Sequence, residues 1–202
     1  SLPSRGLGDV YKRQIVTTRN ADKLQALASQ GVDVREADFS SPESLEKAFQ
    51  GADSMLLISI DASGPRTQAH LNAVSAAEKV GVNHIAYTSM PSAESSPVMF
   101  AHEHEATENA IKQSSIPNAT ITRNNWYFEN LAEYFASILQ SGYWLTSAAE
   151  GRSAQLSRKD LAFAAASALV KPAQGKVILP MNGAQSMTCL LYTSDAADDL
   201  GR

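Results

Sequence analysis

Short apolar runs alternate with helical patterns along most of the chain. The clearest run covers residues 55–60, where nearly every position is apolar, as a parallel strand buried on both faces requires. Between such runs, apolar positions recur at helical spacing and several patterns stop at a glycine, which indicates helices. The predicted strands are 15–18, 32–34, 55–60, 84–89, 119–122 and 177–179, and the predicted helices are 21–30, 42–49, 67–80, 102–113, 131–139 and 159–170. This alternation predicts βαβ units, an α/β fold and a parallel sheet with right-handed crossovers.

Two of the predicted helices carry start signals in their sequence. Residues 40–43, Ser-Ser-Pro-Glu, form the pattern of a capping box, and Pro42 suits the first helical turn. Ser157 is a helix cap, followed by an acidic residue in the first turn, Asp160.

Residues 1–14 and 189–202 are expected to be non-native tails. The stretch 9–14 back-translates as GAT GTG TAT AAG AGA CAG, and its reverse complement, extended by one T and read in a shifted frame, encodes the stretch Cys-Leu-Leu-Tyr-Thr-Ser at 189–194. A natural fold has no reason to carry both strands of one short DNA at its two ends, and this DNA resembles the transposase end used in sequencing-library preparation. We therefore expect one incomplete domain, residues 15–188, between two translated adapters.

Charge and cysteine usage narrow the function classes. The formal net charge is −4, and the charges of the two tails cancel, so the domain is mildly acidic and a poor binder of nucleic acid. The only cysteine, Cys189, lies in a suspected tail, which leaves the domain without a disulfide or a cysteine-ligated metal and fits the cytoplasm. No long uncharged apolar run predicts a membrane span. His102 and His104 are two residues apart and point to different sides of a helix, so no metal site is predicted.

The segment 123–130, Arg-Asn-Asn-Trp-Tyr-Phe-Glu-Asn, is the most informative stretch of the chain. It follows a predicted strand, opens a helix and packs amide, aromatic and acidic groups into one turn. In an open α/β sheet, ligands bind beyond the carboxyl ends of the strands, where this turn would lie. The segment therefore predicts a ligand site, although Trp126 and Tyr127 could equally be core aromatics and Phe128 is predicted to be one.

The alternation of elements matches a doubly wound, Rossmann-like sheet whose first strand and glycine-rich phosphate loop are missing. Gly6 and Gly8 cannot replace that loop because they lie in the suspected tail and precede no helix. At the end of the strand 15–18, where an acidic residue would favour NAD, the chain has Arg19, with Lys23 one turn later. A guanidinium pairs well with a phosphate, so this favours NADPH; the alternative is a solvated helix start.

Together these motifs resemble the bacterial NADPH:quinone oxidoreductases of the NmrA-like, atypical short-chain dehydrogenase group. The resemblance covers essentially all of residues 15–188, and the asparagine-rich turn is its most specific part. The residues that carry it are Ile58 and Ser59, the segment 85–89, His104, Thr107, Glu108 and the segment 123–130.

The resemblance implies a set of site residues and an activity. The implied cofactor contacts run from the adenosine phosphate to the nicotinamide side, and Asn130 is implied to lie near the substrate cleft. The implied contacts are Arg19, Asp38, Phe39, Ile58, Ser59, Ile60, Tyr87, Thr88, Ser89, Asn124, Asn125, Trp126 and Tyr127. The implied activity is hydride transfer from NADPH to a quinone. A small helical lobe that covers the substrate in relatives is missing here, so the literal chain is expected to bind NADPH poorly and to have little activity. The sequence leaves open whether the protein forms a homodimer.

Two departures from related proteins bear on the mechanism. Asn125 stands where relatives have glycine, and because asparagine tolerates left-handed geometry, the turn is expected to survive and the crevice to be narrower. Tyr87 is followed four residues later by Pro91, not by the lysine of ordinary short-chain dehydrogenases, which argues against a carbonyl reductase. Quinone reduction needs less help from the protein. His104 is the candidate proton donor because imidazole titrates near neutral pH; the competing interpretation is a surface histidine beside two glutamates.

Three functional classes therefore stay open. The first is an NADPH-dependent quinone reductase. The second is a non-catalytic redox sensor that binds a dinucleotide and a protein partner. The third is a reductase or epimerase of another small molecule, since fold does not fix function.

Overall fold

The computed structural model describes residues 14–60, 66–143 and 148–188. The predicted adapter-like tails, apart from Gln14, lie outside these residues.

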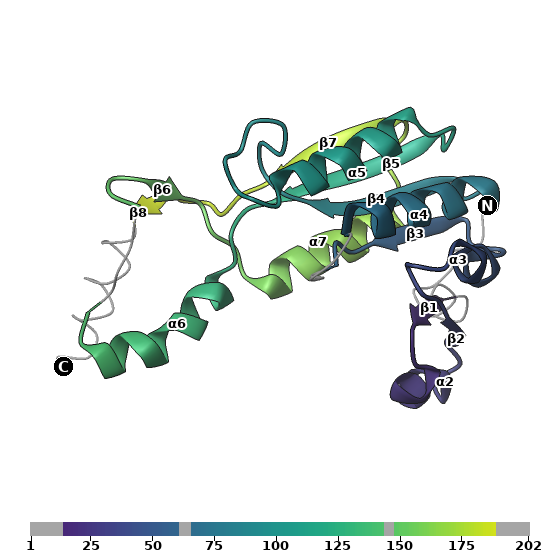
Figure 1. Ribbon diagram of the computed structural model, residues 1–202, viewed down its shortest axis with the longest axis horizontal. Coiled ribbons are helices and arrows are strands. Elements are labelled where there is room, and N and C mark those ends of the chain that lie inside the picture. The colour runs from purple at the N-terminus through teal and green to yellow at the C-terminus, as the bar shows by residue number, and fades with distance from the viewer. Residues whose placement is uncertain (1–13, 61–65, 144–147, 189–202) are drawn as a thin grey trace, which may run out of the picture.

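The main sheet contains four parallel strands in the order β3-β4-β5-β7 (Figure 1). The strands are β3 (Ser54–Leu57), β4 (His84–Ser89), β5 (Asn118–Asn124) and β7 (Lys176–Met181). All six residues of β4 are buried, because β4 has a neighbour on each side and helices on both faces. The predicted α/β fold with a parallel sheet is confirmed.

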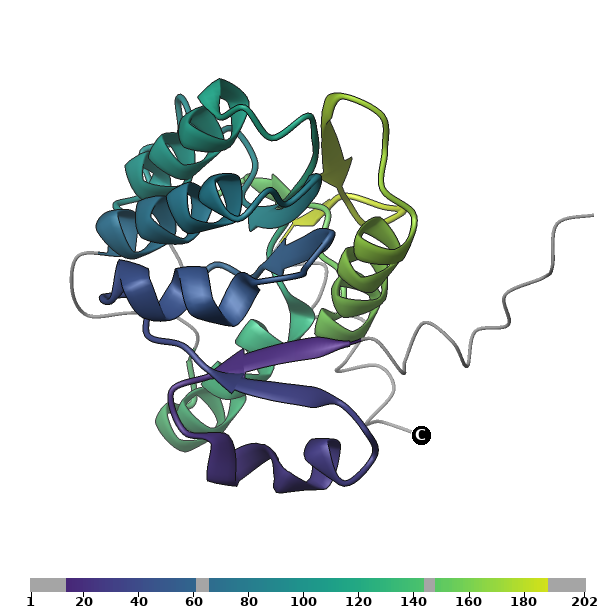
Figure 2. The ribbon, with the colours of Figure 1, turned by 90° about the vertical axis from the view of Figure 1, so that its right-hand side faces the viewer.

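Two smaller sheets complete the set of strands. β1 (Ile15–Thr18) and β2 (Asp33–Glu36) form a separate parallel pair, and β6 (Arg152–Ser153) pairs in the antiparallel direction with β8 (Met187–Thr188). In the view of Figure 2, β1 lies on the side of β2 that is nearer the main sheet. The predicted strands thus pair in parallel, but they form two separate sheets.

Helices cover both faces of the main sheet, as a doubly wound fold requires (Figure 2). One face carries α3 (Pro42–Phe49), α4 (Arg66–Lys79) and α5 (Ala101–Gln113), while α7 (Arg158–Val170) packs on the other face. α6 (Phe128–Ser141) follows β5 and extends away from the sheet (Figure 1).

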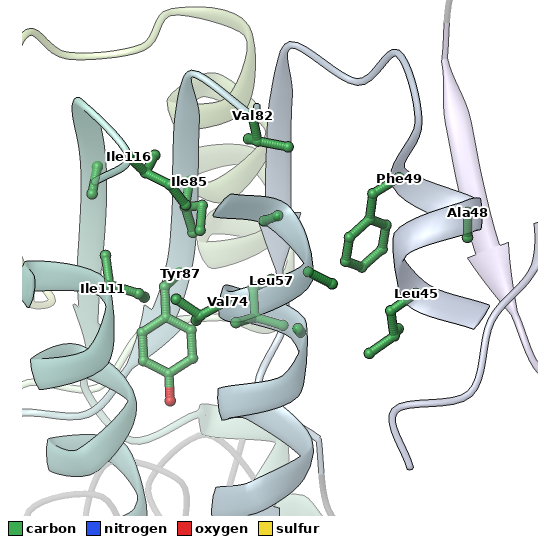
Figure 3. Close-up of a cluster of buried hydrophobic side chains, with 14 of the residues drawn as sticks. Leu45, Ala48, Phe49, Leu57, Val74, Val82, Ile85, Tyr87, Ile111 and Ile116 are labelled. Carbon is green, nitrogen blue, oxygen red and sulfur yellow. The ribbon is translucent and has the colours of Figure 1, made fainter. Parts of the chain in front are cut away.

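The hydrophobic core lies between the main sheet and the helices α3 to α5 (Figure 3). Its members are buried side chains of the strands and of the helix faces that point to them. They include Leu45, Val74, Ile85, Tyr87, Ile111 and Ile121. The apolar spacing of α4 and α5 places these side chains on one face of each helix, which fixes both helices against the sheet.

Strand β3 is shorter and less buried than the sequence predicted. It ends at Leu57, and Ile58 is 61% exposed. The reason is that β3 is the edge strand of the main sheet, and that the following backbone N–H groups bond to side chains instead of to a neighbouring strand. The apolar run therefore continues past the end of the strand.

Three further local predictions need correction. The helix predicted at 21–30 is a 3-10 helix, η1 (Ala21–Leu24), followed by one α-helical turn, α2 (Gln25–Ala28). The strand predicted at 32–34 runs from Asp33 to Glu36. The capping box at 40–43 does not form. Its first serine, Ser40, bonds to Asp38, and the N-cap of the helix is Ser41, which makes no side-chain capping bond. The predicted Ser157 cap is confirmed, since its hydroxyl accepts from the N–H of Asp160.

Candidate active site

Polar groups gather where the strands end, and we call this region the carboxyl edge. It comprises residues 58–60 after β3, Thr88 and Ser89 at the end of β4, residues 124–127 at and after the end of β5, and residues 182–183 after β7. Because the strands are parallel, these ends lie along one edge of the sheet.

Two buried side chains hold the turn after β3. The N–H of Ser59 donates to Thr88 Oγ1 at 2.8 Å, and the N–H of Ile60 donates to His70 Nε2 at 3.1 Å. Since an N–H group can only donate, Nε2 of His70 is the accepting nitrogen and Nδ1 carries the proton, which faces Thr107 Oγ1 at 3.1 Å. Thr107 donates in turn to the carbonyl oxygen of Glu103. The neutral imidazole therefore fixes the backbone at Ile60.

A second buried imidazole, His104, lies behind Tyr87. Arg66 Nη2 is 2.9 Å from His104 Nε2, and a guanidinium can only donate, so Nδ1–H of His104 donates to the Tyr87 hydroxyl at 2.9 Å. Burial, followed by the charge of Arg66, lowers the pKa of His104 to about 4. At neutral pH this imidazole is uncharged, so the expected titration near pH 7 is wrong. The competing surface interpretation is also wrong, because His104 is only 5% exposed whereas His102 is exposed.

Tyr87 itself is part of the core. Its side chain is fully buried and points toward His70 and His104, so it does not reach a ligand at the carboxyl edge. Burial raises the pKa of its hydroxyl. The implied contact of Tyr87 with a nicotinamide is therefore not supported by its position.

A buried carboxylate ties the ends of β4 and β5 together. Glu108 is 1% exposed, and Arg123 binds it with two nitrogens, at 2.9 Å and 2.8 Å. Ser89 donates to the same carboxylate at 2.7 Å, and Lys112 does so at 3.0 Å. Burial raises the pKa of Glu108, but the hydrogen bonds from Arg123, Ser89 and Lys112 outweigh it, so the pKa lies below its ordinary value. Arg123 is therefore a structural cation of the carboxyl edge.

Asn125 connects the turn after β5 to two distant segments. Its Nδ2 donates to Asn182 Oδ1 at 3.0 Å, and its Oδ1 accepts from Ser153 Oγ at 3.3 Å and from the N–H of Trp126. The turn forms without left-handed geometry at this position, because Asn125 is not among the described non-glycine residues with positive φ. The asparagine side chain thus builds the turn.

A cavity of about 370 Å³ opens beside this turn. Its volume falls within the range of small-molecule sites, roughly 300–1,000 Å³. The walls are partly apolar and come from the start of α6, from α7 and the segment that precedes it, and from the stretch between β7 and β8 with Met187. They comprise Phe128, Gln155, Leu156, Asp160, Asn182, Gly183, Ala184, Gln185 and Met187. Phe128, predicted to be a core aromatic, is 39% exposed, because α6 leaves the sheet at this point.

None of the predicted site residues is among those that line this cavity. Arg19 follows β1, and its charge helps to lower the pKa of Asp38, although hydrogen bonds from Ser40 contribute more. Phe39 packs against the core, with its ring edge toward His70. Asn130 accepts a hydrogen bond from Arg158 at 2.8 Å and does not line the cavity. The structure thus groups the predicted residues that follow β3, β4 and β5, whereas Arg19, Asp38, Phe39 and Asn130 lie outside this group.

Several residues that build the site were not predicted from the sequence. They are His70, Gln155, Asn182 and Gly183. A signal for His70 was present, because it shares the helical spacing of the buried Ala73, Val74 and Ala77 and is a polar residue in an apolar stripe. Gln155 had no such signal, since it lies in an irregular segment.

Comparisons with known proteins bear on the family. A family model described as NAD(P)H-binding matches residues 12–172. Quinone oxidoreductase 2 of Escherichia coli is 35% identical over 188 residues, 93% of this chain and 65% of that protein. An NmrA-like family domain-containing oxidoreductase of Aspergillus flavus is 29% identical over 182 residues, 86% of this chain and 58% of that protein. The chain therefore spans about two thirds or less of the length of these relatives.

Solved structures give the same picture. The E. coli NADPH-dependent quinone oxidoreductase complexed with NADPH matches with a TM-score of 0.86 at 35% identity, over 93% of this chain and 66% of that one. The triphenylmethane reductase of Citrobacter sp., complexed with NADP(H), matches with a TM-score of 0.84 at 35% identity, over 93% of this chain and 67% of that one. The resemblance that the sequence motifs carried is confirmed.

Proposed function

Since the chain belongs to the NAD(P)H-binding domain family, we propose that its protein reduces quinones with NADPH. The observation that carries this proposal is the cavity at the carboxyl edge, where apolar walls and convergent amides lie beside the turn after β5. Such a cavity suits a flat, largely apolar ring with carbonyl groups on its rim. The similarity to the E. coli quinone oxidoreductase supports this substrate class.

The residues of the carboxyl edge, together with Arg19 after β1 and with Asp38 and Phe39 after β2, suit a dinucleotide. Arg19 would hold the phosphate that distinguishes NADPH from NADH, near Asp38 and Phe39 at the adenine. Ser59 and Ile60 belong to a turn whose backbone is held by Thr88 and His70. Ile58 is exposed on the same turn, and Thr88, Ser89, Asn124, Asn125, Trp126 and Tyr127 would flank the nicotinamide side, with Asn130 nearer the substrate entrance. The bound NADPH supplies the hydride.

The protein contributes orientation and exclusion of water. Reduction of the quinone requires one hydride, which carries two electrons, and one proton, which together give the hydroquinone. His104 is neutral and accepts from Arg66, so it is a support of the site and solvent is the proposed proton source. A stabilised hydroquinone anion takes its proton from water without a positioned acid, which agrees with the missing lysine after Tyr87.

The test uses the protein encoded by the complete reading frame of the source gene. Sequencing that gene across codons 4–14 and 189–194 checks whether these codons are native. NADPH oxidation is then followed with 1,4-benzoquinones and 1,4-naphthoquinones. We expect turnover with a preference for NADPH over NADH, and we expect Arg19→Gln to reduce this preference at least tenfold while Lys47→Gln, on α3, leaves it unchanged.

Two outcomes would contradict the proposal. Tight NADPH binding without turnover of any quinone would favour the redox-sensor alternative. Turnover confined to triphenylmethane dyes would assign the cavity to the substrate class of the Citrobacter reductase instead.

A further inference from the structure

The side chain of Gln155 carries a buried amide oxygen that is not used within the fold. Gln155 is 6% exposed, and among the described residues its Oε1 has no hydrogen-bond partner. Buried polar atoms are paired in the great majority of cases, so an unpaired one in a cavity wall points to a group that a ligand completes.

The backbone around Gln155 is held closely, which keeps this amide in place. Leu156 N–H donates to the carbonyl oxygen of Trp126 at 3.2 Å, and Gly183 N–H donates to that of Ala154 at 2.9 Å. A Cβ on Gly183 would lie 2.2 Å from the carbonyl oxygen of Gln155, so only glycine allows this approach. Gln155 therefore belongs to a fixed segment of backbone.

The other walls of the cavity decide which ligand the amide can meet. Phe128, Leu156, Ala184 and Met187 supply apolar surface. The amide of Asn182 is already engaged by Asn125, and Asp160 is engaged by Ser157 at the start of α7. Gln185 also carries an amide but is exposed to solvent, so Gln155 Oε1 is the buried acceptor among these side chains that has no partner in the described part of the chain. An acceptor requires an O–H or N–H group on the ligand.

We propose that Gln155 is a specificity residue that accepts a hydrogen bond from a hydroxyl group on an aromatic ring bound in this cavity. Within the proposed function, which this inference deepens, the hydroxylated ring is the hydroquinone product or a quinone that bears a hydroxyl side group. The amide then stabilises the reduced ring more than the oxidised one, because only the reduced ring has a hydroxyl in place of each carbonyl.

The test compares two ligands on the 202-residue chain by ligand-observed NMR titration, without NADPH. 1-Naphthol carries the hydroxyl donor, and 1-methoxynaphthalene is its matched partner without one. We expect the chain to bind naphthol at least fivefold more tightly than the methyl ether. Gln155→Met, which keeps the length of the side chain, should reduce this ratio to about one, while Gln68→Met on the exposed face of α4 leaves it unchanged.

A urea titration of the same variants keeps the test decisive. Removal of an unpaired buried amide leaves the urea midpoint of Gln155→Met equal to that of the wild type or raises it, which a merely structural glutamine would not do. If Gln155→Met fails to fold, the wild-type ligand pair still decides. An equal affinity for the two ligands, no binding of naphthol, or a preference that survives in folded Gln155→Met would overturn the proposal.

The outcome is independent of catalysis. A hydroxyl preference that depends on Gln155 stands even if the gene product reduces no quinone. Conversely, quinone turnover without this preference refutes the role of Gln155 and leaves the proposed function intact.

Discussion

The two edges of the main sheet use buried polar groups in opposite ways. The edge at which the parallel strands begin is called the amino edge here. At this edge, the ring of His84 lies between Ser54 Oγ at 2.7 Å and Thr120 Oγ1 at 3.0 Å. Lys176 donates to three carbonyl oxygens at the end of α5. These polar groups thus find their hydrogen-bond partners within the fold.

The carboxyl edge is built differently. Both buried side-chain atoms that lack a hydrogen-bond partner within the described residues, Arg66 Nε and Gln155 Oε1, lie on this side of the sheet. Backbone N–H groups of the turn after β3 are held by side chains, where a regular strand would hold them. The buried polar groups of the amino edge are thus paired within the fold, whereas the carboxyl edge keeps buried atoms that have no partner in the described part of the chain.

The largest expected effect concerns the buried carboxylate of the carboxyl edge. Glu108→Ala leaves Arg123 without its buried partner, and we expect it to lower the free energy of unfolding by about 3–5 kcal/mol. Glu46→Ala removes a partner of Lys79 in an exposed ion pair and should cost about 0–1 kcal/mol. Urea unfolding of both variants measures this. Equal losses would mean that Glu108 is no more important than a surface charge.

The pH dependence of stability is the next effect. Burial lowers the pKa of His70 and of His104 from 6.5 to about 4. Each of these histidines therefore binds a proton more tightly in the unfolded chain than in the folded protein. The stability that the two neutral imidazoles contribute is complete above pH 6.5 and is lost as the pH falls toward 4. Between pH 7.5 and pH 5 we expect a loss on the order of 2–4 kcal/mol for the pair. Unfolding free energies that stay constant over this range would contradict the neutral imidazoles.

Two buried histidines at opposite edges allow a direct comparison. His70→Leu leaves the N–H of Ile60 unpaired, and we expect a loss of about 1–3 kcal/mol in unfolding free energy. His84→Leu should cost a similar amount at the amino edge. Only His70→Leu should weaken NADPH binding by the complete gene product, by at least fivefold in a fluorescence titration. Equal weakening by both variants would remove the distinction between the edges.

The smallest effect separates two helix starts. Ser157 caps α7 with its side chain, so Ser157→Ala should cost about 1 kcal/mol. Ser41 is the N-cap of α3 but makes no side-chain capping bond, and Ser41→Ala should change stability by less than about 0.5 kcal/mol. Thermal unfolding of the two variants checks the order, and a larger loss for Ser41→Ala would reverse it.

The order of the elements could be predicted because local patterns dictate it. The run at 84–89 became a fully buried strand, since its residues suit a position with neighbours on both sides. The run at 55–60 misled at its end, because Ile58 looks like a strand residue until the partners of the next two N–H groups are known. Such partners come from segments 10 to 29 residues away in the sequence, and no local pattern contains them.

The candidate site could be predicted only where one segment carries it. The turn at 124–127 was recognisable from its own amides and aromatics. The cavity beside it joins the starts of two helices to the segment after β7, so Gln155 and Gly183 meet only in the folded chain. His104 shows the converse: its residue type favoured a proton donor, and its burial beside Arg66 made it neutral.

The central claim is that the carboxyl edge binds NADPH. The most direct measurement is a ¹H–¹⁵N NMR titration of the 202-residue chain with NADPH at millimolar concentration, where even weak binding shifts the backbone amide signals. We expect the largest shifts at Ser59, Ile60, Ser89 and Asn125, with the amino-edge signals of Ser54 and His84 unchanged. Shifts that concentrate at the amino edge, or a spectrum that NADPH does not change, would contradict it.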